Sequence, residues 1–413
     1  MDTHRSDASA KAITRRGLLR TALAAMAAPA FIPASALGRD GRPSPANRIT
    51  VGSIGVGGRG SGNTKSLCGY PEAQVVAVCD VRRNNRERAR DAVNQAYGAN
   101  GCTACNDFRE ITRRPDLDAI LIGTPDHWHV PIAIDAMRHG KDVFSEKPET
   151  LTVREGRLLA DIVQRTGRVY SGGSQRVWQD YNWFHRMVRG GAIGEVQEVW
   201  VNVGSPSRPS HLPAQPLPEG LDWDLWLGPA PWVPFNSQLL NFRAWRDYSG
   251  GGMTDWGAHG FGGALFACNL QDTGPVEIIP PDGKEHARLT YVFANGVRIY
   301  HGGGKGGILT FRGTQGEIDG GSARRLAAPT ISIPNYRGSG GILGDFLHCV
   351  RTRQRPFRHV EVAHRTVSHC HLGNIAVWLN RPLRWDPVKE EIVGDPEASR
   401  WLERPSRAPW HLV

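Results

Sequence analysis

The sequence predicts an α/β protein in which a parallel sheet is followed by a second, largely antiparallel sheet. Between residues 48 and 174, short apolar runs alternate with segments of helical length, which is typical of a parallel sheet covered by helices on both faces. From residue 175 to 413, short runs joined by turn residues replace that alternation, which is typical of antiparallel strands. We therefore expect two domains, and the length gives each an ample core.

The first domain is predicted to contain five strands, the first four of which are each followed by a helix. The series opens with RITVGSI and continues through VVAVCD, DAILIGTP, KDVFSEKP and RVYSGG. These strands are expected over residues 48–54, 75–80, 118–125, 141–148 and 168–173.

The second domain is predicted to begin with a helix over 183–194 and to continue mainly as strands. An Asn-Gly pair within YVFANGVRIYHG indicates a hairpin. The segment 205–255 is rich in Trp, Pro and Gly and has no clear periodicity, and long loops of this kind tend to be functional. Strands are expected over 195–204, 276–280, 287–303, 306–321 and 330–334, and helices over 341–352 and 360–379, before a Trp-rich tail.

The N-terminus is predicted to be a twin-arginine signal peptide over residues 1–36, followed by a linker over 37–47. Arg15 and Arg16 precede a weakly apolar run that ends in Ala-Ser-Ala. Arg20 and Pro29 interrupt this run, so it is too short and broken to span a bilayer stably. The prediction is a periplasmic or otherwise exported protein; a disordered basic tail and an uncleaved anchor are the alternatives.

The charge excludes nucleic acid as an expected partner. The formal net charge is +10, and residues 1–36 carry five Lys or Arg and two Asp, so the remainder carries +10 − 5 + 2 = +7. No basic block is long, and none alternates with aromatic residues. A mildly basic surface would help to attract anionic ligands.

The cysteines and histidines do not indicate a metal site. Cys102 and Cys105 form a C-x-x-C pair, but no second pair completes a zinc site. A surface-loop disulfide or two unrelated thiols are the expected explanations, and the role of the pair stays open. His364, His369 and His371 lie on a predicted amphipathic helix and are expected to fill surface or interior positions.

A glycine-rich turn follows the first predicted strand and opens a helix. Its first glycine permits the tight turn, its second lets the backbone approach a pyrophosphate, and its third lets the helix pack on the strand. Asp80 ends the next strand, 20 positions after the third glycine (80 − 60 = 20). The sequence therefore predicts a Rossmann dinucleotide-binding domain, in which the turn residues Gly55, Gly57, Gly58, Arg59 and Gly60 contact the cofactor.

Asp80 also indicates which dinucleotide binds. A carboxylate at this position can accept hydrogen bonds from a ribose diol and would repel a 2′-phosphate, which favours NAD. Arg82 and Arg83 follow at once and could accommodate that phosphate, so NADP stays open.

Two further clusters carry candidate chemistry. Lys147, in Glu146-Lys147-Pro148, lies at the carboxyl end of a predicted strand, where open α/β sheets bind their ligands; a salt-bridged turn is the alternative. Asp255 and His259 are four residues apart and would share one side of a helix. Histidine suits removal of a proton from a carbinol, and a carboxylate could orient its ring. The alternative is a helix-start Asp and a packed core His; no third residue suggests a metal.

The motifs GVGGRG, TPDHWH, SEKPET and GGGMTDWGAH, in this order, resemble those of the Gfo/Idh/MocA family of nicotinamide-dependent oxidoreductases, in its exported branch. The resemblance covers residues 48–413 and implies a Rossmann domain and an α+β domain that binds substrate and forms a homodimer or homotetramer. It also implies that Lys147 lies between nicotinamide and substrate, that His259 is the acid/base and that Asp255 binds substrate. The cofactor would be lined by Thr124, Pro125, His129 and Glu146 as well as Lys147, and Arg176 would lie near the pocket mouth.

Two positions depart from the family pattern. Asp126 stands where the family often has Asn, and Gly263 stands where it often has Asp. Contacts to the substrate are therefore expected to differ from those of the family. Trp245 is our candidate for a substrate contact, because indole faces suit sugar C–H surfaces, although core packing is the expected role for most of the cluster. That cluster comprises Trp223, Trp226, Trp232, Trp245 and Trp256.

The resemblance implies hydride transfer between a sugar, polyol or sugar derivative and a tightly bound cofactor that is exported within the folded protein. A redox-neutral enzyme that cleaves glycosides by transient oxidation of a ring hydroxyl is the alternative. A non-catalytic protein that binds a sugar or dinucleotide is a third hypothesis, which an intact Lys147 and His259 disfavour.

Overall fold

The computed structural model describes residue 44 and residues 47–412. The signal peptide predicted over 1–36 and most of the predicted linker lie outside these residues. Within the described part of the chain, no helix combines the length and apolar character needed to cross a membrane.

The first sheet has six parallel strands in the order β3-β2-β1-β4-β5-β6. β1 pairs with β2 on one side and with β4 on the other, so the strand order reverses beside β1. A crevice forms at the carboxyl ends of the strands at such a reversal, and it is the usual ligand site of open α/β sheets. The strands are β1 (Ile49–Ile54), β2 (Ala73–Cys79), β3 (Thr103–Cys105), β4 (Ala119–Ile122), β5 (Asp142–Ser145) and β6 (Tyr170–Gly172).

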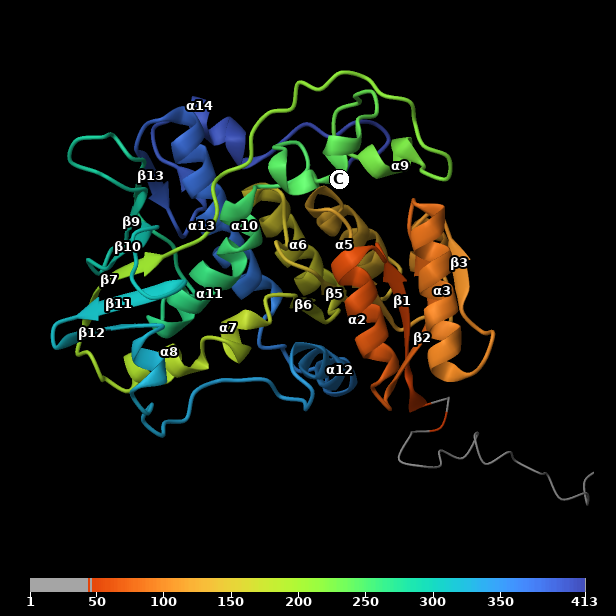
Figure 1. Cartoon of the computed structure of the whole chain (residues 1–413), viewed down its shortest axis with the longest axis horizontal. Helices are drawn as coiled ribbons and strands as arrows, with labels where there is room; N and C mark the ends of the chain where they lie inside the picture. The colour runs from red at the N-terminus through yellow and green to blue at the C-terminus, as the bar shows by residue number, and fades with distance from the viewer. Residues whose placement is uncertain (1–43, 45–46, 413) are drawn as a thin grey trace, which may run out of the picture. The chain divides into compact units, whose positions relative to one another are not determined.

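Helices cover both faces of this sheet, as predicted (Figure 1). The first four that follow its strands are α2 (Gly58–Cys68), α3 (Arg83–Tyr97), α4 (Arg109–Thr112) and α5 (His129–Arg138). α6 (Val153–Thr166) is capped at its N-terminus by Thr152, whose hydroxyl accepts a hydrogen bond from the Glu155 amide at 3.2 Å. The Glu155 carboxylate accepts in return from the Leu151 amide at 3.0 Å, which satisfies two donors at the helix start.

The edge strand β3 was not predicted. It consists of three residues within the C-x-x-C segment, where Cys105 pairs with Cys79 of β2. All seven cysteines are free thiols, so Cys102 and Cys105 form no disulfide. Cys102 directly precedes this short strand and Cys105 ends it.

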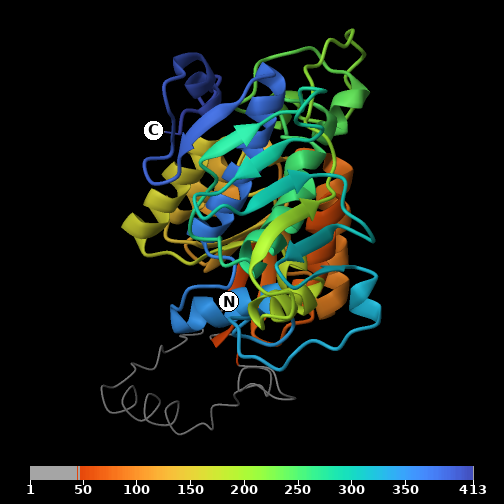
Figure 2. The same cartoon turned by 90° about the vertical axis from the view of Figure 1, so that its left-hand side faces the viewer.

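The second sheet has eight strands in the order β12-β11-β7-β10-β9-β8-β13-β14. Its pairs are antiparallel except for β7 with β10, so the sheet is largely antiparallel, as predicted. Figure 2 turns this sheet toward the viewer. The strands are β7 (Val196–Val201), β8 (Glu277–Ile279), β9 (Thr290–Val292), β10 (Arg298–His301), β11 (Leu309–Gly313), β12 (Gly316–Asp319), β13 (Leu383–Asp386) and β14 (Glu391–Ile392).

The predicted hairpin is confirmed, because β9 and β10 pair through a turn at Asn295-Gly296, where Gly296 has φ of +87°. The strand predicted over 330–334 is wrong, since this segment has no regular structure. β13 and β14 come instead from the Trp-rich tail, where no strand was predicted. The segment TISIP pairs with no strand, and β12 remains the edge of the sheet on that side.

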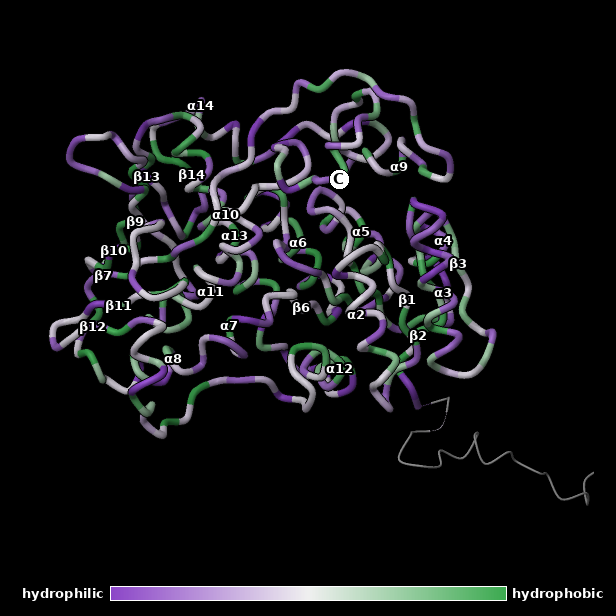
Figure 3. Tube along the Cα trace, in the orientation of Figure 1, coloured by the Kyte–Doolittle hydropathy of each residue, from purple (hydrophilic) through white to green (hydrophobic). Residues whose placement is uncertain are grey.

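The helices of the second half begin with α7 (Arg176–Gln179) and α8 (Asn182–Arg189). α10 (Gly252–Asp255) and α11 (Gly257–Ala267) follow, and every residue of α11 is buried. α12 (Ile342–Thr352), much of which is hydrophobic in Figure 3, packs its apolar side against the core of the first sheet. The second half of the chain therefore completes the first core.

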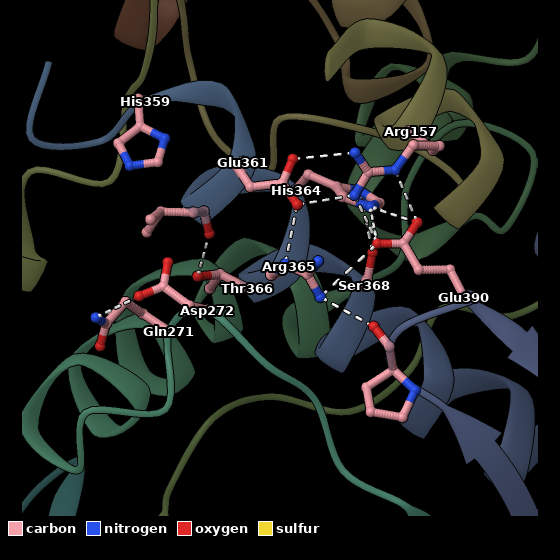
Figure 4. Close-up of polar contacts among 12 residues, drawn as sticks. Arg157, Gln271, Asp272, His359, Glu361, His364, Arg365, Thr366, Ser368 and Glu390 are labelled. Atoms are coloured by element: carbon pink, nitrogen blue, oxygen red, sulfur yellow. Dashed lines mark hydrogen bonds and ion pairs between the residues drawn. The ribbon is translucent and has the colours of Figure 1, made fainter. Parts of the chain in front are cut away.

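α6 and α13 (Val360–Leu379) are joined by a charged network (Figure 4). Arg157 of α6 lies 2.8 Å from Glu361 and 2.7 Å from Glu390, and His364 lies 2.9 Å from Glu390. Within the described residues, no cluster of His, Cys, Asp and Glu could hold a metal ion. His364, His369 and His371 are all buried, in agreement with an interior role.

Residues 205–250, here called the strap, cross from the second sheet to the carboxyl edge of the first. The strap contains α9 (Trp223–Leu227), η4 (Ser237–Leu240) and η5 (Phe242–Ala244). The Arg83 amide donates to the carbonyl of Gly220 at 2.8 Å, and Trp128 Nε1 donates to the carbonyl of Leu225 at 2.9 Å. These contacts place the strap over the ligand edge of the parallel sheet.

Candidate active site

A cavity of about 480 Å³ lies at the carboxyl edge of the first sheet. Its lining comes from the turn after β1, the ends of β2, β4 and β5, α7, the α10–α11 segment and the strap. It brings together most of the residues predicted from the sequence: Gly55, Gly57, Gly58, Arg59, Asp80, Thr124, Pro125, Glu146, Lys147, Arg176, Asp255 and His259.

The glycine turn is fixed by close backbone packing. Gly55 has φ of +77°, and a Cβ there would lie 2.5 Å from the Thr124 amide nitrogen. A Cβ on Gly60 would lie 1.9 Å from the Gly55 carbonyl oxygen, so Gly60 backs the turn and does not line the cavity. At Gly58 a Cβ would meet nothing within 4 Å. α2 starts there without a side-chain cap, which leaves its first amides for an anionic ligand.

Asp80 lies in the cavity and is buried. It accepts hydrogen bonds from the Arg82 amide at 2.9 Å and from Asn85 Nδ2 at 3.3 Å. Burial raises the pKa of its carboxyl group, and these hydrogen bonds oppose the rise. Arg82 lines the cavity, whereas Arg83 pairs with Glu219 of the strap at 3.3 Å.

Glu146 and His129 brace the site. Glu146 Oε1 accepts from Asn63 at 2.7 Å and from Arg59 at 3.0 Å, which ties the end of β5 to α2. His129 does not line the cavity; its ring nitrogens contact the carbonyls of Thr124 at 2.9 Å and Pro148 at 2.6 Å. Burial lowers the pKa of His129, and the contacts with the two carbonyl oxygens oppose this shift. The ring therefore ties the two loops together.

Lys147 forms an ion pair across the cavity. Its Nζ lies 2.5 Å from Asp255 Oδ1 and 3.0 Å from the Asp255 carbonyl oxygen. Arg243 of the strap contacts the same Oδ1 through Nε at 2.9 Å. Burial raises the pKa of Asp255, but the two cations outweigh it and hold that pKa below its ordinary value. Asp255 is therefore anionic and shared between two cations.

His259 lies in the first turn of α11 and is 3% exposed. Burial, together with the charges of Lys147 and Arg176, lowers the pKa of the imidazole to about 2. Its Nδ1 has no hydrogen-bond partner among the described residues. Asp255 thus pairs with cations and not with the imidazole, contrary to the orienting role that the spacing suggested. The ring is a neutral base in a cavity that also holds an ammonium group.

The substrate candidates have different environments. Arg176 lines the cavity, and its guanidinium lies 5.0 Å from the ring centroid of Trp256. The structure does not bring Trp245 to the cavity; it is buried in an aromatic cluster of the strap, and its Nε1 donates to the carbonyl of Gln238. Trp226 and Trp256 line the cavity, Trp223 is buried, and Trp232 is 62% exposed.

Arg243 and Asp126 are cavity residues to which the sequence reasoning gave no role. Arg243 lies in the irregular strap, where no periodicity or motif marks it. Asp126 was noticed only as a departure from the family pattern. The other departure, Gly263, is explained by packing, because a Cβ there would lie 2.5 Å from the ring of Tyr181.

The site fits a nicotinamide dinucleotide. Uncapped amides at the start of α2 suit a pyrophosphate and Asp80 suits a ribose. His259 and Lys147 line the same cavity, close enough for the lysine charge to lower the pKa of the imidazole. Fold and site thus define a dinucleotide-binding oxidoreductase. Residues 49–174 match the model described as oxidoreductase family, NAD-binding Rossmann fold, and residues 199–412 match its C-terminal alpha/beta domain. The chain belongs to the Gfo/Idh/MocA oxidoreductase family.

Solved structures share this fold. A myo-inositol 2-dehydrogenase from Lactobacillus plantarum has 17% identity and a TM-score of 0.59, over 82% of this chain and 99% of that chain. A scyllo-inositol dehydrogenase from Lactobacillus casei, with bound NAD(H) and scyllo-inositol, has 15% identity and a TM-score of 0.57 over the same shares. At these identities the similarity shows the fold alone.

Two relatives have a higher sequence identity to this chain, but over a shorter part of it. An alpha-N-acetylgalactosaminidase from Shewanella oneidensis is 37% identical over 121 residues, which are 29% of this chain and 26% of that protein. A glycosyl hydrolase family 109 protein from Saccharopolyspora erythraea is 36% identical over 159 residues, 36% of this chain and 33% of that protein. The chain thus matches about a quarter to a third of the length of these relatives.

Proposed function

We propose that the protein transfers hydride between a sugar, polyol or sugar derivative and a tightly held nicotinamide dinucleotide. One observation carries this proposal: a neutral imidazole and a lysine ammonium group line one cavity with the glycine turn. The bound dinucleotide would supply the hydride acceptor or donor. The inositol dehydrogenases that share the fold support a polyhydroxylated substrate.

In the oxidising direction, His259 accepts the hydroxyl proton of the substrate on a ring nitrogen. Burial and the nearby cations lower the pKa of the imidazole, so the ring is unprotonated in the free protein and can accept a proton. Lys147 donates a hydrogen bond to the oxygen on which negative charge develops. Asp255, held by Arg243, positions the ammonium group through its 2.5 Å contact.

The strap supports the retention of the cofactor. It lies over the carboxyl edge of the sheet, and the C-terminal tail fastens it: Arg407 contacts Asp224 Oδ1 at 2.6 Å and the Gly228 carbonyl at 3.0 Å. A protein exported in the folded state could carry such a cofactor to a compartment without a nicotinamide pool. We therefore propose export by the twin-arginine route, with NAD as the cofactor, and assembly as a dimer or tetramer. Native mass spectrometry of the protein recovered from the cell envelope tests all three.

The activity is tested with holoenzyme and a panel of myo-inositol, scyllo-inositol, glucose, galactose and N-acetylgalactosamine. Reduction of the cofactor is followed by absorbance in the absence of oxygen. Lys147→Ala should lower the rate about 100-fold or more, as expected for loss of a charged group that stabilises the developing oxyanion. Lys65→Ala, on the exposed side of α2, is the matched control and should leave the rate unchanged. Full activity in Lys147→Ala would remove the assigned role.

A second candidate function is redox-neutral cleavage of glycosides through transient oxidation of a ring hydroxyl. It is favoured by the relatives named alpha-N-acetylgalactosaminidase and glycosyl hydrolase family 109. It predicts turnover of nitrophenyl glycosides without net consumption of cofactor. Solvent deuterium should also appear at the carbon beside the one that is oxidised, and products free of deuterium would count against this reaction.

A further inference from the structure

Asp126 is a cavity residue whose carboxyl group is only half satisfied. It begins η3 (Asp126–Trp128), directly after β4, and is 2% exposed. The hydroxyl of Ser249 hydrogen-bonds to its carboxyl group. Oδ2 has no partner among the described residues, although the side chain lines the cavity. Leaving such an oxygen buried and unpaired is costly unless a ligand supplies the missing partner.

The neighbouring residues of the same motif each have at least one partner; His127 Nδ1 is also unpaired among the described residues, but His127 does not line the cavity. His127 Nε2 lies 3.0 Å from the Trp226 carbonyl oxygen, and Trp128 Nε1 donates to the carbonyl of Leu225. His129 joins Thr124 to Pro148. Of these four consecutive side chains, Asp126 alone combines a place in the cavity with an unpaired buried polar atom in the described structure.

The charged groups around Asp126 come from three elements. Arg243 of the strap and Lys147 after β5 attract its negative charge, whereas Asp255 of α10 repels it. Both cations already contact Asp255 Oδ1 directly. Burial is the largest effect and raises the pKa of Asp126 to about 7. The carboxyl group is therefore protonated in a large fraction of the molecules at neutral pH.

A protonated carboxyl group has an O–H that needs an acceptor, and the described residues give Oδ2 none. Polyhydroxylated substrates carry several oxygens that can accept such a bond. We infer that Asp126 contacts the substrate and donates a hydrogen bond from its carboxyl group to a second oxygen, distinct from the one that Lys147 and His259 act on. This inference rests on the proposed function for the class of substrate, and it makes Asp126 a residue that selects polyols over simple alcohols.

Kinetics with panel substrates test the contact. In the wild type, KM should change as the pH increases through about 7, because Asp126 is converted there from a hydrogen-bond donor to a charged acceptor. Asp126→Asn keeps a donor of similar shape, so its KM should stay within about threefold of the wild type at acidic pH and lose this pH dependence. Asp126→Leu removes the donor and should raise KM about tenfold with a smaller change in kcat. Asp161→Asn, exposed on α6, is the matched control. An unchanged pH profile in Asp126→Asn would overturn the inference.

Infrared difference spectroscopy of the holoenzyme separates this inference from the proposed function. Wild type minus Asp126→Asn should show a protonated carboxyl band that fades as the pH rises through about 7. Added myo-inositol, scyllo-inositol or another panel member should shift this band. If no panel member shifts it, the inference is overturned even where one is oxidised. If one shifts it without being oxidised, the inference stands and the proposed function fails.

Discussion

The ion pair between Lys147 and Asp255 makes a prediction that does not depend on knowing the substrate. Both side chains are 14% exposed, and they are joined by a 2.5 Å contact. The perturbation is a double-mutant cycle of Lys147→Met, Asp255→Asn and the two combined. Methionine keeps most of the length of the lysine side chain without its charge, and asparagine keeps the shape of the carboxylate.

The expected loss in free energy of unfolding depends on which charges each substitution leaves without a partner. Breaking a buried pair by removing one partner costs about 3–5 kcal/mol in free energy of unfolding. Lys147→Met should lie below that range, at about 2 kcal/mol, because Arg243 still neutralises Asp255 from 2.9 Å. Asp255→Asn should cost about 3 kcal/mol, because it leaves Lys147 and Arg243 close together without an anion. The double variant removes one of these cations and should cost about 3 kcal/mol, less than the sum of about 5.

Chemical denaturation of all four proteins, in the same cofactor state, measures the cycle. The expected coupling is about 2 kcal/mol, and thermal unfolding should reproduce the order, with about 2 °C for each kcal/mol at this chain length. If the single effects add within about 0.5 kcal/mol, the two groups do not interact as the structure describes. The positioning role of Asp255 would then be refuted as well.

Three further predictions concern other parts of the fold. Gly60→Ala should destabilise the protein by more than about 3 kcal/mol and abolish dinucleotide binding, because its Cβ would lie 1.9 Å from a carbonyl oxygen; Gly58→Ala should leave the melting temperature nearly unchanged. Burial raises the pKa of Glu149 to about 7, so the folded state binds more protons than the unfolded state between pH 4.5 and about 7, and stability falls as the pH rises through that window. Glu149→Gln should flatten this slope in denaturation measured across the same pH range, and an unchanged slope would exclude Glu149 as its source. Arg407→Ala should speed the loss of dinucleotide during dialysis, and equal retention would show that the tail does not fasten the strap.

The first sheet was predictable because each of its main strands is a compact apolar run that ends at a turn residue. β3 could not be predicted because a strand of three residues gives too little hydrophobic pattern. The two cysteines of this segment instead suggested a disulfide or unrelated thiols. The strand predicted over 330–334 failed for the opposite reason. Its alternating pattern is local, whereas a strand also needs a partner, and this segment pairs with neither edge strand of the second sheet, β12 or β14.

The site was predictable where a motif fixes both residue type and position. Lys147 and His259 come from different domains, yet each follows from a local pattern. Arg243 has no such pattern, and its place beside Asp255 depends on how the irregular strap returns to the sheet. The same limit applies to Trp245: composition alone could not decide whether its indole would face the cavity or the interior of the strap, where the structure places it.

The two candidate functions differ in the number of protons that the site must move. A substitution of Asp126 can therefore distinguish between them. Oxidation of a carbinol needs one base, and the neutral His259 suffices. Cleavage of a glycoside needs, in addition, a proton removed from the neighbouring carbon and a proton delivered to the departing oxygen. Among the carboxyl groups of the cavity, Asp126 combines a pKa raised to about 7 with an unpaired oxygen, so it can deliver that proton. Asp126→Asn should therefore retain sugar oxidation and lose glycoside turnover by about 100-fold, as expected for loss of a general acid. If the variant cleaves nitrophenyl glycosides at the wild-type rate, the proton comes from elsewhere, and Asp126 contributes binding alone.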